Sequence, residues 1–115
     1  MRYNPGMSDE HQIVIPPSFL ALYSDARRRL TEPVDTVRSR YELCEDLSNQ
    51  LVDHAKAMHF DNGISEDEVI ARCRAGLSTP ESGLSAPEGE WVVTRLAELL
   101  GWLECMPAAA RQATP

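Results

Sequence analysis

The sequence predicts an all-α fold, a compact bundle of about four helices with one long central helix and an extended N-terminal arm. Apolar residues recur every three or four positions from Pro33 to Met58, which is the spacing of one helix face. Two later segments share a helix-start pattern in which a glycine, an apolar residue and a serine precede a glutamate. A sheet is not expected, because Ile13–Ile15 is too short a strand to build one.

The segment from Pro33 to about His59 is predicted to be the longest helix, because it contains no internal glycine or proline. Thr31 is expected to cap its start, and Gly63 to occupy a left-handed position after its end. Its predicted apolar face comprises Val34, Val37, Tyr41, Cys44, Ser48, Leu51, Ala55 and Met58, flanked by Leu47 and Val52. Its predicted solvated face comprises Arg38, Arg40, Glu42, Glu45, Asp46, Asp53 and Lys56.

The N-terminal region is expected to begin with a disordered tail over residues 1–12, which are mostly polar. Ile13 to Pro17 then forms a short extended arm, since its two prolines disfavour a helix. Ser18 is predicted to cap a short helix from Phe19 to Tyr23. This region has two interpretations: it packs on the long helix as core, or it is exposed and docks on a partner.

Three adjacent arginines, Arg27, Arg28 and Arg29, follow the short helix and stand out in an acidic chain. One interpretation is a solvated loop whose guanidinium groups pair with nearby acids. The other is a specific site for an anion or a phosphate group, which guanidinium groups bind in a bidentate manner.

A third helix is predicted to start at Ser65, whose hydroxyl forms a capping box with Glu68, and to end at Gly76. Its expected apolar face comprises Val69, Ile70 and Cys73.

A last helix is predicted to start with the same motif, and residues 13–103 are expected to form one domain followed by a frayed tail, 104–115. The capping pair is Ser85 and Glu88, the helix runs from about Ala86 to Leu100 or Leu103, and its apolar face holds Trp91, Val92, Leu96, Leu99, Leu100 and Leu103.

The composition is that of an ordinary globular protein, with 43% hydrophobic and 25% charged residues. The net charge of −7 argues against binding to nucleic acid or to anionic membranes, where a basic surface is expected. Three cysteines, an odd number without a CxxC motif, indicate free thiols and a cytoplasmic location. The sequence has no apolar run near the ~18 residues of a membrane span, and no secretory signal is recognised.

The sequence predicts no catalytic, cofactor-binding or metal-binding residues. His54 and His59 lie five positions apart, which places them on different sides of a helix, so a metal site is not expected. Cys44 falls on the apolar face of the long helix and is interpreted as a small core residue rather than a nucleophile. The glycine-rich motifs of nucleotide-binding proteins are absent, so the chain is not expected to be an enzyme that uses a nucleotide.

A helix-turn-helix could be composed of Glu66–Ala75 and Ala86–Leu100. The second of these helices is expected to present Glu88, Glu90 and Glu98 outward, with Arg95 as its only basic residue. A recognition helix that faces phosphates should be basic, so DNA binding is kept only as an alternative.

A family resemblance is carried by four segments: IPPSFLALY (Ile15 to Tyr23), RYELCEDL (Arg40 to Leu47), GISEDEV (Gly63 to Val69) and WVVTRLAELLGW (Trp91 to Trp102). In these segments the chain resembles a family of short, uncharacterised proteobacterial proteins, some of which bear the automatic label "ATPase with chaperone activity". The resemblance spans residues 13–102 and implies a bacterial protein with a link to chaperones. The ATPase part of the label is not expected to apply, because every ATP-binding motif is missing, and the resemblance implies no residue roles.

The predicted function is a non-catalytic protein-interaction module, an adaptor or a small subunit of a larger assembly with a link to chaperones. The alternative is a small metal-dependent enzyme or a DNA-binding helical protein. Many apolar groups in the arm and the last helix predict an uncovered patch there, which serves a homodimer or a larger partner. The predicted partner-binding residues are Phe19, Leu20, Tyr23, Arg27, Arg28, Arg29, Trp91 and Trp102.

Overall fold

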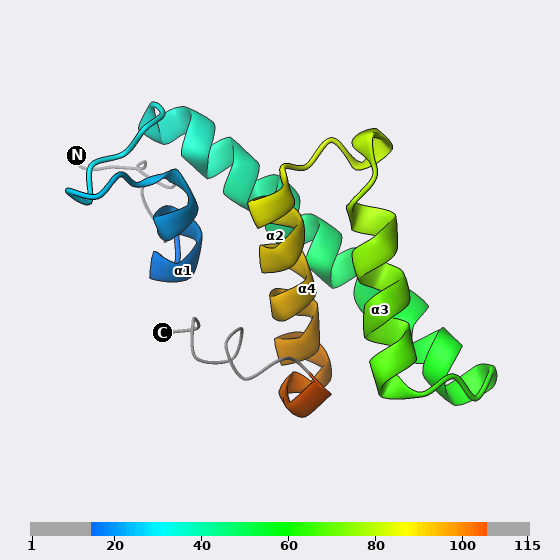
Figure 1. Ribbon diagram of the computed structural model, residues 1–115. Coiled ribbons are helices and arrows are strands. Elements are labelled where there is room, and N and C mark those ends of the chain that lie inside the picture. Colours follow the sequence, from blue (N-terminus) through cyan, green and yellow to red (C-terminus); the bar gives the residue numbers. More distant parts are fainter. Residues whose placement is uncertain (1–14, 106–115) are drawn as a thin grey trace, which may run out of the picture.

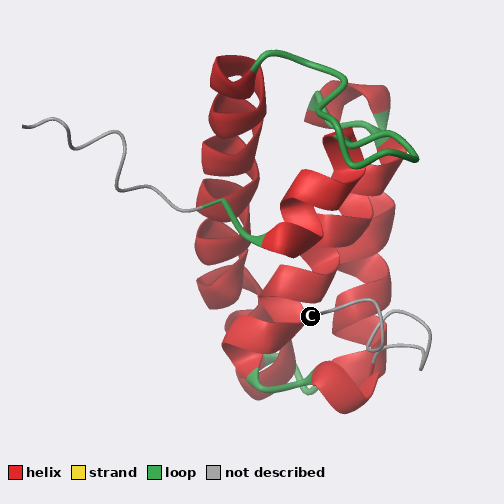
Figure 2. Cartoon of the chain, turned by 90° about the vertical axis from the view of Figure 1, so that its left-hand side faces the viewer, coloured by secondary structure: helices red, strands yellow, loops and turns green. Residues whose placement is uncertain are grey.

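The computed structural model describes residues 15–105, which form helices joined by short loops and contain no strand (Figures 1 and 2). The predicted all-α fold with one long helix is therefore confirmed for this part of the chain. The tail and the start of the arm, residues 1–14, lie outside the described residues, as do residues 106–115. The elements are α1 (Pro17–Leu20), η2 (Ala21–Tyr23), α2 (Val34–Lys56), η3 (Ala57–Asp61), α3 (Glu66–Leu77), η4 (Pro80–Ser82), α4 (Ala86–Leu100) and η5 (Leu103–Cys105).

The long helix is α2, and it continues directly into a π-helical segment, η3. Gly63 follows with a φ of 71°, which is the left-handed conformation expected after the helix end. The backbone N–H of Ile64 then donates to the carbonyl of Met58 at 3.1 Å, which satisfies a carbonyl in the last turns. Most of the predicted apolar face is buried or half-buried, but Val34 in the first turn is 49% exposed, which corrects that prediction.

Two predicted helix caps are wrong, because their hydroxyl groups bond elsewhere. α1 starts after Pro16 and α2 after Pro33, and neither start has a side-chain cap. Both prolines adopt the extended conformation that suits a residue before the first helical turn. The hydroxyl of Ser18 instead accepts from the indole N–H of Trp91 at 3.0 Å, and that of Thr31 donates to the carbonyl of Tyr23.

The caps of α3 and α4 are confirmed, since Ser65 and Ser85 each accept a hydrogen bond from the backbone N–H three residues later. Only Ser85 belongs to a complete capping box, because the carboxylate of Glu68 accepts from Arg72 rather than from the cap. α3 ends at Leu77, one residue later than expected. α4 ends at Leu100, because the chain turns into a left-handed conformation at the next residue, a glycine with a φ of 77°.

α4 is the helix around which the other helices are arranged: it crosses α2, lies beside α3 and faces α1 (Figure 1). Val92 and Val93 are adjacent in α4 and point about 100° apart around the helix axis, and each joins a different apolar cluster. One cluster comprises Phe19, Val37, Cys44 and Val92; the other comprises Ala55, Val69, Ile70, Cys73, Val93, Leu96, Ala97 and Trp102.

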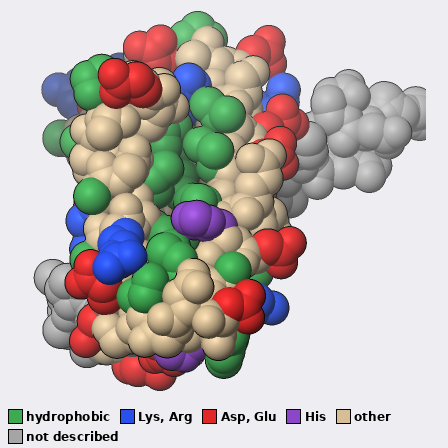
Figure 3. Space-filling model, turned by 90° about the vertical axis from the view of Figure 1, so that its right-hand side faces the viewer, with side chains coloured by type: hydrophobic (Ala, Val, Ile, Leu, Met, Phe, Trp, Pro, Cys, Tyr) green, Lys and Arg blue, Asp and Glu red, His purple; other side chains and the backbone are tan. Residues whose placement is uncertain are grey.

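The prediction that uncovered apolar surface lies on the arm and the last helix is wrong for the described residues. Phe19 is fully buried and Trp102 is only 6% exposed, because residues of α2 and α4 cover Phe19 and residues of α2, α3 and α4 cover Trp102. On the face shown in Figure 3, hydrophobic side chains gather in a hollow strip between two ridges. The large hydrophobic residues that the described part exposes most are Leu30, Val34, Leu43 and Phe60.

The burial of α4 leads to a stability prediction. Leu96→Ala removes a fully buried side chain next to Val93 and Trp102, so we expect it to lower the free energy of unfolding by about 2–5 kcal/mol. Val34→Ala, at a half-exposed position in α2, is the control and should change it by less than about 0.5 kcal/mol. Urea denaturation followed by circular dichroism measures both, and equal effects would contradict the assignment of α4 as the core helix.

Candidate functional site

A buried carboxylate, Glu88, lies where α4, α2 and the end of η2 meet. Its exposed fraction is 1%, and it is the only charged side chain among the described residues that is fully buried. The prediction that Glu88 faces outward is therefore wrong. A buried charge is stable only when hydrogen bonds and an opposite charge replace the lost water, so the groups around Glu88 form a candidate functional site.

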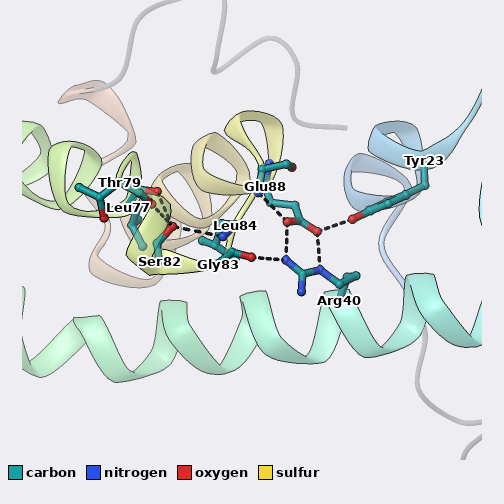
Figure 4. A network of polar contacts seen from close by, with 9 residues as sticks. Tyr23, Arg40, Leu77, Thr79, Ser82, Gly83, Leu84 and Glu88 are labelled. Atoms are coloured by element: carbon teal, nitrogen blue, oxygen red, sulfur yellow. Dashed lines mark hydrogen bonds and ion pairs between the residues drawn. The ribbon is translucent and has the colours of Figure 1, made fainter.

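Three segments surround Glu88 with hydrogen-bond donors (Figure 4). Arg40 of α2 binds it with two nitrogens, Nε to Oε2 at 2.9 Å and Nη2 to Oε1 at 2.7 Å. Oε2 also accepts from the hydroxyl of Tyr23, and Oε1 accepts from the backbone N–H of Ser85 at 2.9 Å. Nη2 of Arg40 further donates to the carbonyl of Gly83 at 2.7 Å. Each carboxylate oxygen thus accepts two hydrogen bonds.

This environment holds Glu88 as a carboxylate and Tyr23 as a neutral phenol. Burial raises the pKa of Glu88, but the hydrogen bonds from Arg40, Tyr23 and Ser85 outweigh it and lower the pKa to about 2. Burial, with the hydrogen bond and charge of Glu88, raises the pKa of Tyr23 to about 12. A general acid or base needs a pKa near the working pH and access to a substrate, and neither group has these properties.

Three of the four predicted partner-binding aromatic residues, Phe19, Tyr23 and Trp91, are brought together, but as an internal cluster. The ring of Phe19 lies at the centre, with ring centroids at 5.7 Å from Tyr23 and 5.2 Å from Trp91. Tyr41 completes the group at 5.6 Å from Phe19 and 5.8 Å from Trp91. Of the two interpretations of the arm, packing as core is therefore the one that holds for Phe19.

The remaining predicted partner-binding residues are Leu20, Trp102 and the three arginines. Leu20 is half-buried against the cluster of Phe19, and Trp102 lies in the second cluster beyond α4. The loop between η2 and α2 exposes Arg27, Arg28 and Arg29.

A second bidentate ion pair joins α2 to α4. Arg95 of α4 donates from Nε to Oε1 of Glu45 at 2.9 Å and from Nη2 to Oε2 at 3.0 Å, and its Nη1 reaches Glu98 at 3.1 Å. The hydrogen bonds from Arg95 lower the pKa of Glu45. Arg40 and Glu45 were both predicted to lie on the solvated face of α2. That prediction is wrong for these two residues, because their side chains bind residues of α4.

Neither described buried cysteine has the properties of a nucleophile. Burial is the largest cause that raises the pKa of Cys44, to about 12, and burial also raises the pKa of Cys73. Because the thiolate is the reactive form, both thiols are inert near neutral pH. Residues 15–105 also contain no group of three or more His, Cys, Asp or Glu side chains arranged to hold a metal ion.

The capping motif was the sequence feature that could have located this site. Ser85 and Glu88 were identified as a capping box, and the glutamate of such a box turns back toward the helix start instead of into solvent. The partners Arg40 and Tyr23 lie 48 and 65 positions away in the chain, and no local pattern connects them to Glu88.

Comparison with known proteins adds no assignment, because no protein-family model, curated protein or solved structure matches the chain. Within the described residues, no helix combines the length and the apolar character that crossing a membrane requires.

The network around Glu88 predicts a large cost for removing its charge. Glu88→Gln leaves the guanidinium of Arg40 without its carboxylate, and we expect the free energy of unfolding to fall by about 2–3 kcal/mol. Glu90→Gln, in the same helix, breaks an exposed pair with Arg74 and should cost less than about 1 kcal/mol. Chemical denaturation of both variants tests the difference; if Glu88→Gln costs no more than Glu90→Gln, the network does not hold the helices together.

The lowered pKa of Glu88 also predicts a pH dependence of stability. Its pKa is about 2 in the folded protein and near 4.5 without the fold, so its stabilising contribution is complete above about pH 5 and is lost toward pH 2. We therefore expect the stability difference between wild type and Glu88→Gln to be largest above about pH 5 and to shrink on acidification. Thermal unfolding of both proteins across this range measures it, and a difference that stays constant would contradict the assigned pKa.

Proposed function

We propose that this protein is a non-catalytic protein-interaction module, an adaptor or a small subunit of a larger assembly. The proposal is supported by the way the fold uses its reactive groups. Glu88 is bound to both Tyr23 and Arg40, and Cys44 is buried with a raised pKa. These side chains stabilise the helix packing and offer no free acid, base or nucleophile.

The observation that carries the proposal is the exposure of Phe60 in the π-helical segment η3. Its side chain is 70% exposed, the largest exposure of any large hydrophobic residue in the described part. Exposed aromatic residues are typical anchors of protein interfaces, and π-helical turns are frequent at functional sites.

The ring of Phe60 is held in place by its neighbour. The imidazole of His59 lies at 4.6 Å from the Phe60 ring and at 5.1 Å from the buried Trp102, measured between ring centroids. Nδ1 of His59 donates to the carbonyl of Ile64 at 2.7 Å, which fixes the imidazole. Phe60 thus packs against His59, which itself packs against the core, while most of Phe60 is exposed to solvent. A side chain that is already held in place loses less conformational entropy on binding.

Photo-crosslinking tests the proposal. A photoreactive phenylalanine analogue in place of Phe60 should give a discrete crosslinked product in the native cell, whereas the analogue at exposed Gln50 should not. The mass of the product separates a homodimer from a complex with another protein. Phe60→Ala should abolish the complex without changing the unfolding temperature, because the side chain is exposed. The same weak, diffuse products at both positions would contradict an interface at Phe60.

A further inference from the structure

The loop between η2 and α2 carries two arginines that no acidic side chain of residues 15–105 neutralises. Neither Arg27 nor Arg28 forms an ion pair with another described residue. Every other arginine of the described part has a carboxylate partner: Arg29 pairs with Asp25, Arg38 with Asp35, Arg40 with Glu88, Arg72 with Glu68, Arg74 with Glu90, and Arg95 with Glu45. In a chain of net charge −7, two consecutive arginines without an ion pair to a described residue are an exception that local pairing does not explain.

Hydrogen bonds from backbone N–H groups, to the side chain of Asp25 and to backbone carbonyls, hold this loop, residues 25–30, in one shape. Oδ1 of Asp25 accepts from the N–H groups of Arg27 at 2.8 Å and Arg29 at 2.9 Å. The N–H of Asp25 donates to the carbonyl of Arg29 at 2.8 Å, and the N–H of Thr31 to the carbonyl of Tyr23 at 2.7 Å. Tyr23 is itself bound to the buried Glu88, so the loop is connected to the core.

Arg28 occupies the left-handed region at a φ of 66°, the only non-glycine residue of the described part to do so. This conformation is uncommon for a residue with a Cβ atom, and a glycine would adopt it without steric strain. An arginine at this position therefore adds backbone strain that a glycine would not. Such strain is expected where a side chain serves binding rather than folding.

Exposed apolar side chains lie next to these arginines in the chain. Leu30 at the end of the loop is 40% exposed, and Val34 in the first turn of α2 is 49% exposed. These are two of the four large hydrophobic residues that the described part leaves exposed. The stretch from Arg27 to Val34 thus combines unpaired positive charge with uncovered apolar surface.

We propose that the loop, together with Val34, is a docking site for a short acidic peptide segment of a partner protein, a segment that also carries an apolar side chain. Charge complementarity favours carboxylates opposite Arg27 and Arg28, and the apolar residue covers Leu30 and Val34. A long polyanion such as nucleic acid fits less well than a short peptide. Its charges would extend beyond the two arginines to Glu32 and Asp35, which flank the site in an acidic chain. The inference rests on the proposed interaction function and identifies the chemistry of one partner segment.

Fluorescence anisotropy of the full chain with labelled peptides tests the inference. The probe is a short peptide rich in glutamate with one leucine; matched probes replace its glutamates by glutamine, or its leucine by serine. We expect binding to the first peptide to weaken with added salt, to be lost with the glutamine peptide and to be weaker with the serine peptide. Binding of single-stranded oligo-dT more tightly than the glutamate peptide would overturn the choice of ligand.

Two double variants with the same change in net charge serve as the test and its control. Arg27→Gln/Arg28→Gln should weaken binding of the glutamate peptide by about tenfold or more, the loss of a charge-assisted contact. Arg72→Gln/Arg74→Gln, at arginines that already have partners, should change it by less than about twofold. Equal losses in both variants would mean that net charge alone attracts the peptide, which overturns the site.

A glycine variant separates binding from folding. Arg28→Gly removes the guanidinium and relieves the left-handed strain, so binding should weaken while the unfolding temperature does not fall. Unchanged binding would overturn the role of Arg28. If the peptide fails to bind while the crosslinked product at Phe60 persists, the docking inference fails and the proposed function stands; loss of both would reject both.

Discussion

The burial of the Glu88 carboxylate is the constraint on which the arrangement of helices depends. A charge with 1% exposure requires donors for both oxygens, and the donors come from α2, from η2 and from the turn that precedes α4. If one of these segments moved away, an uncompensated charge would be left in the interior, which is far more costly than an apolar mismatch. The ion pair with Arg40 therefore selects one placement of α4 on α2.

Polar specificity complements an apolar core to which α2 contributes mostly small side chains. Where α2 meets the rest of the fold, Cys44, Ser48 and Ala55 are buried, and such residues allow close approach without fixing a register. On α2 the positive residue of the two ion pairs, Arg40, precedes the negative one, Glu45. On α4 the order is reversed, since Glu88 precedes Arg95, so a shifted register would bring like charges together. α4 then has one position in which Val92 and Val93 enter their separate clusters.

This division of roles leaves the surface, and not the interior, with side chains available for binding. The fold neutralises or binds its buried acid, phenol and thiol, and all of them serve packing. The surface retains what packing does not use: the ring of Phe60 and the guanidinium groups of Arg27 and Arg28. Features that fold stability does not require, such as the left-handed Arg28, are the ones that point to binding.

The sequence by itself determined the helices, because their signals are local: the spacing of apolar residues in α2, the caps Ser65 and Ser85, and the left-handed Gly63. Only the tertiary structure decided which charged residues are solvated. Arg40, Glu45 and Glu88 look like surface residues when each helix is considered alone, and their removal from solvent, complete only for Glu88, depends on partners about 50 positions away. The same dependence moved Phe19 and Trp102 from the expected interface into the core, since periodicity identifies an apolar face but not the element that covers it.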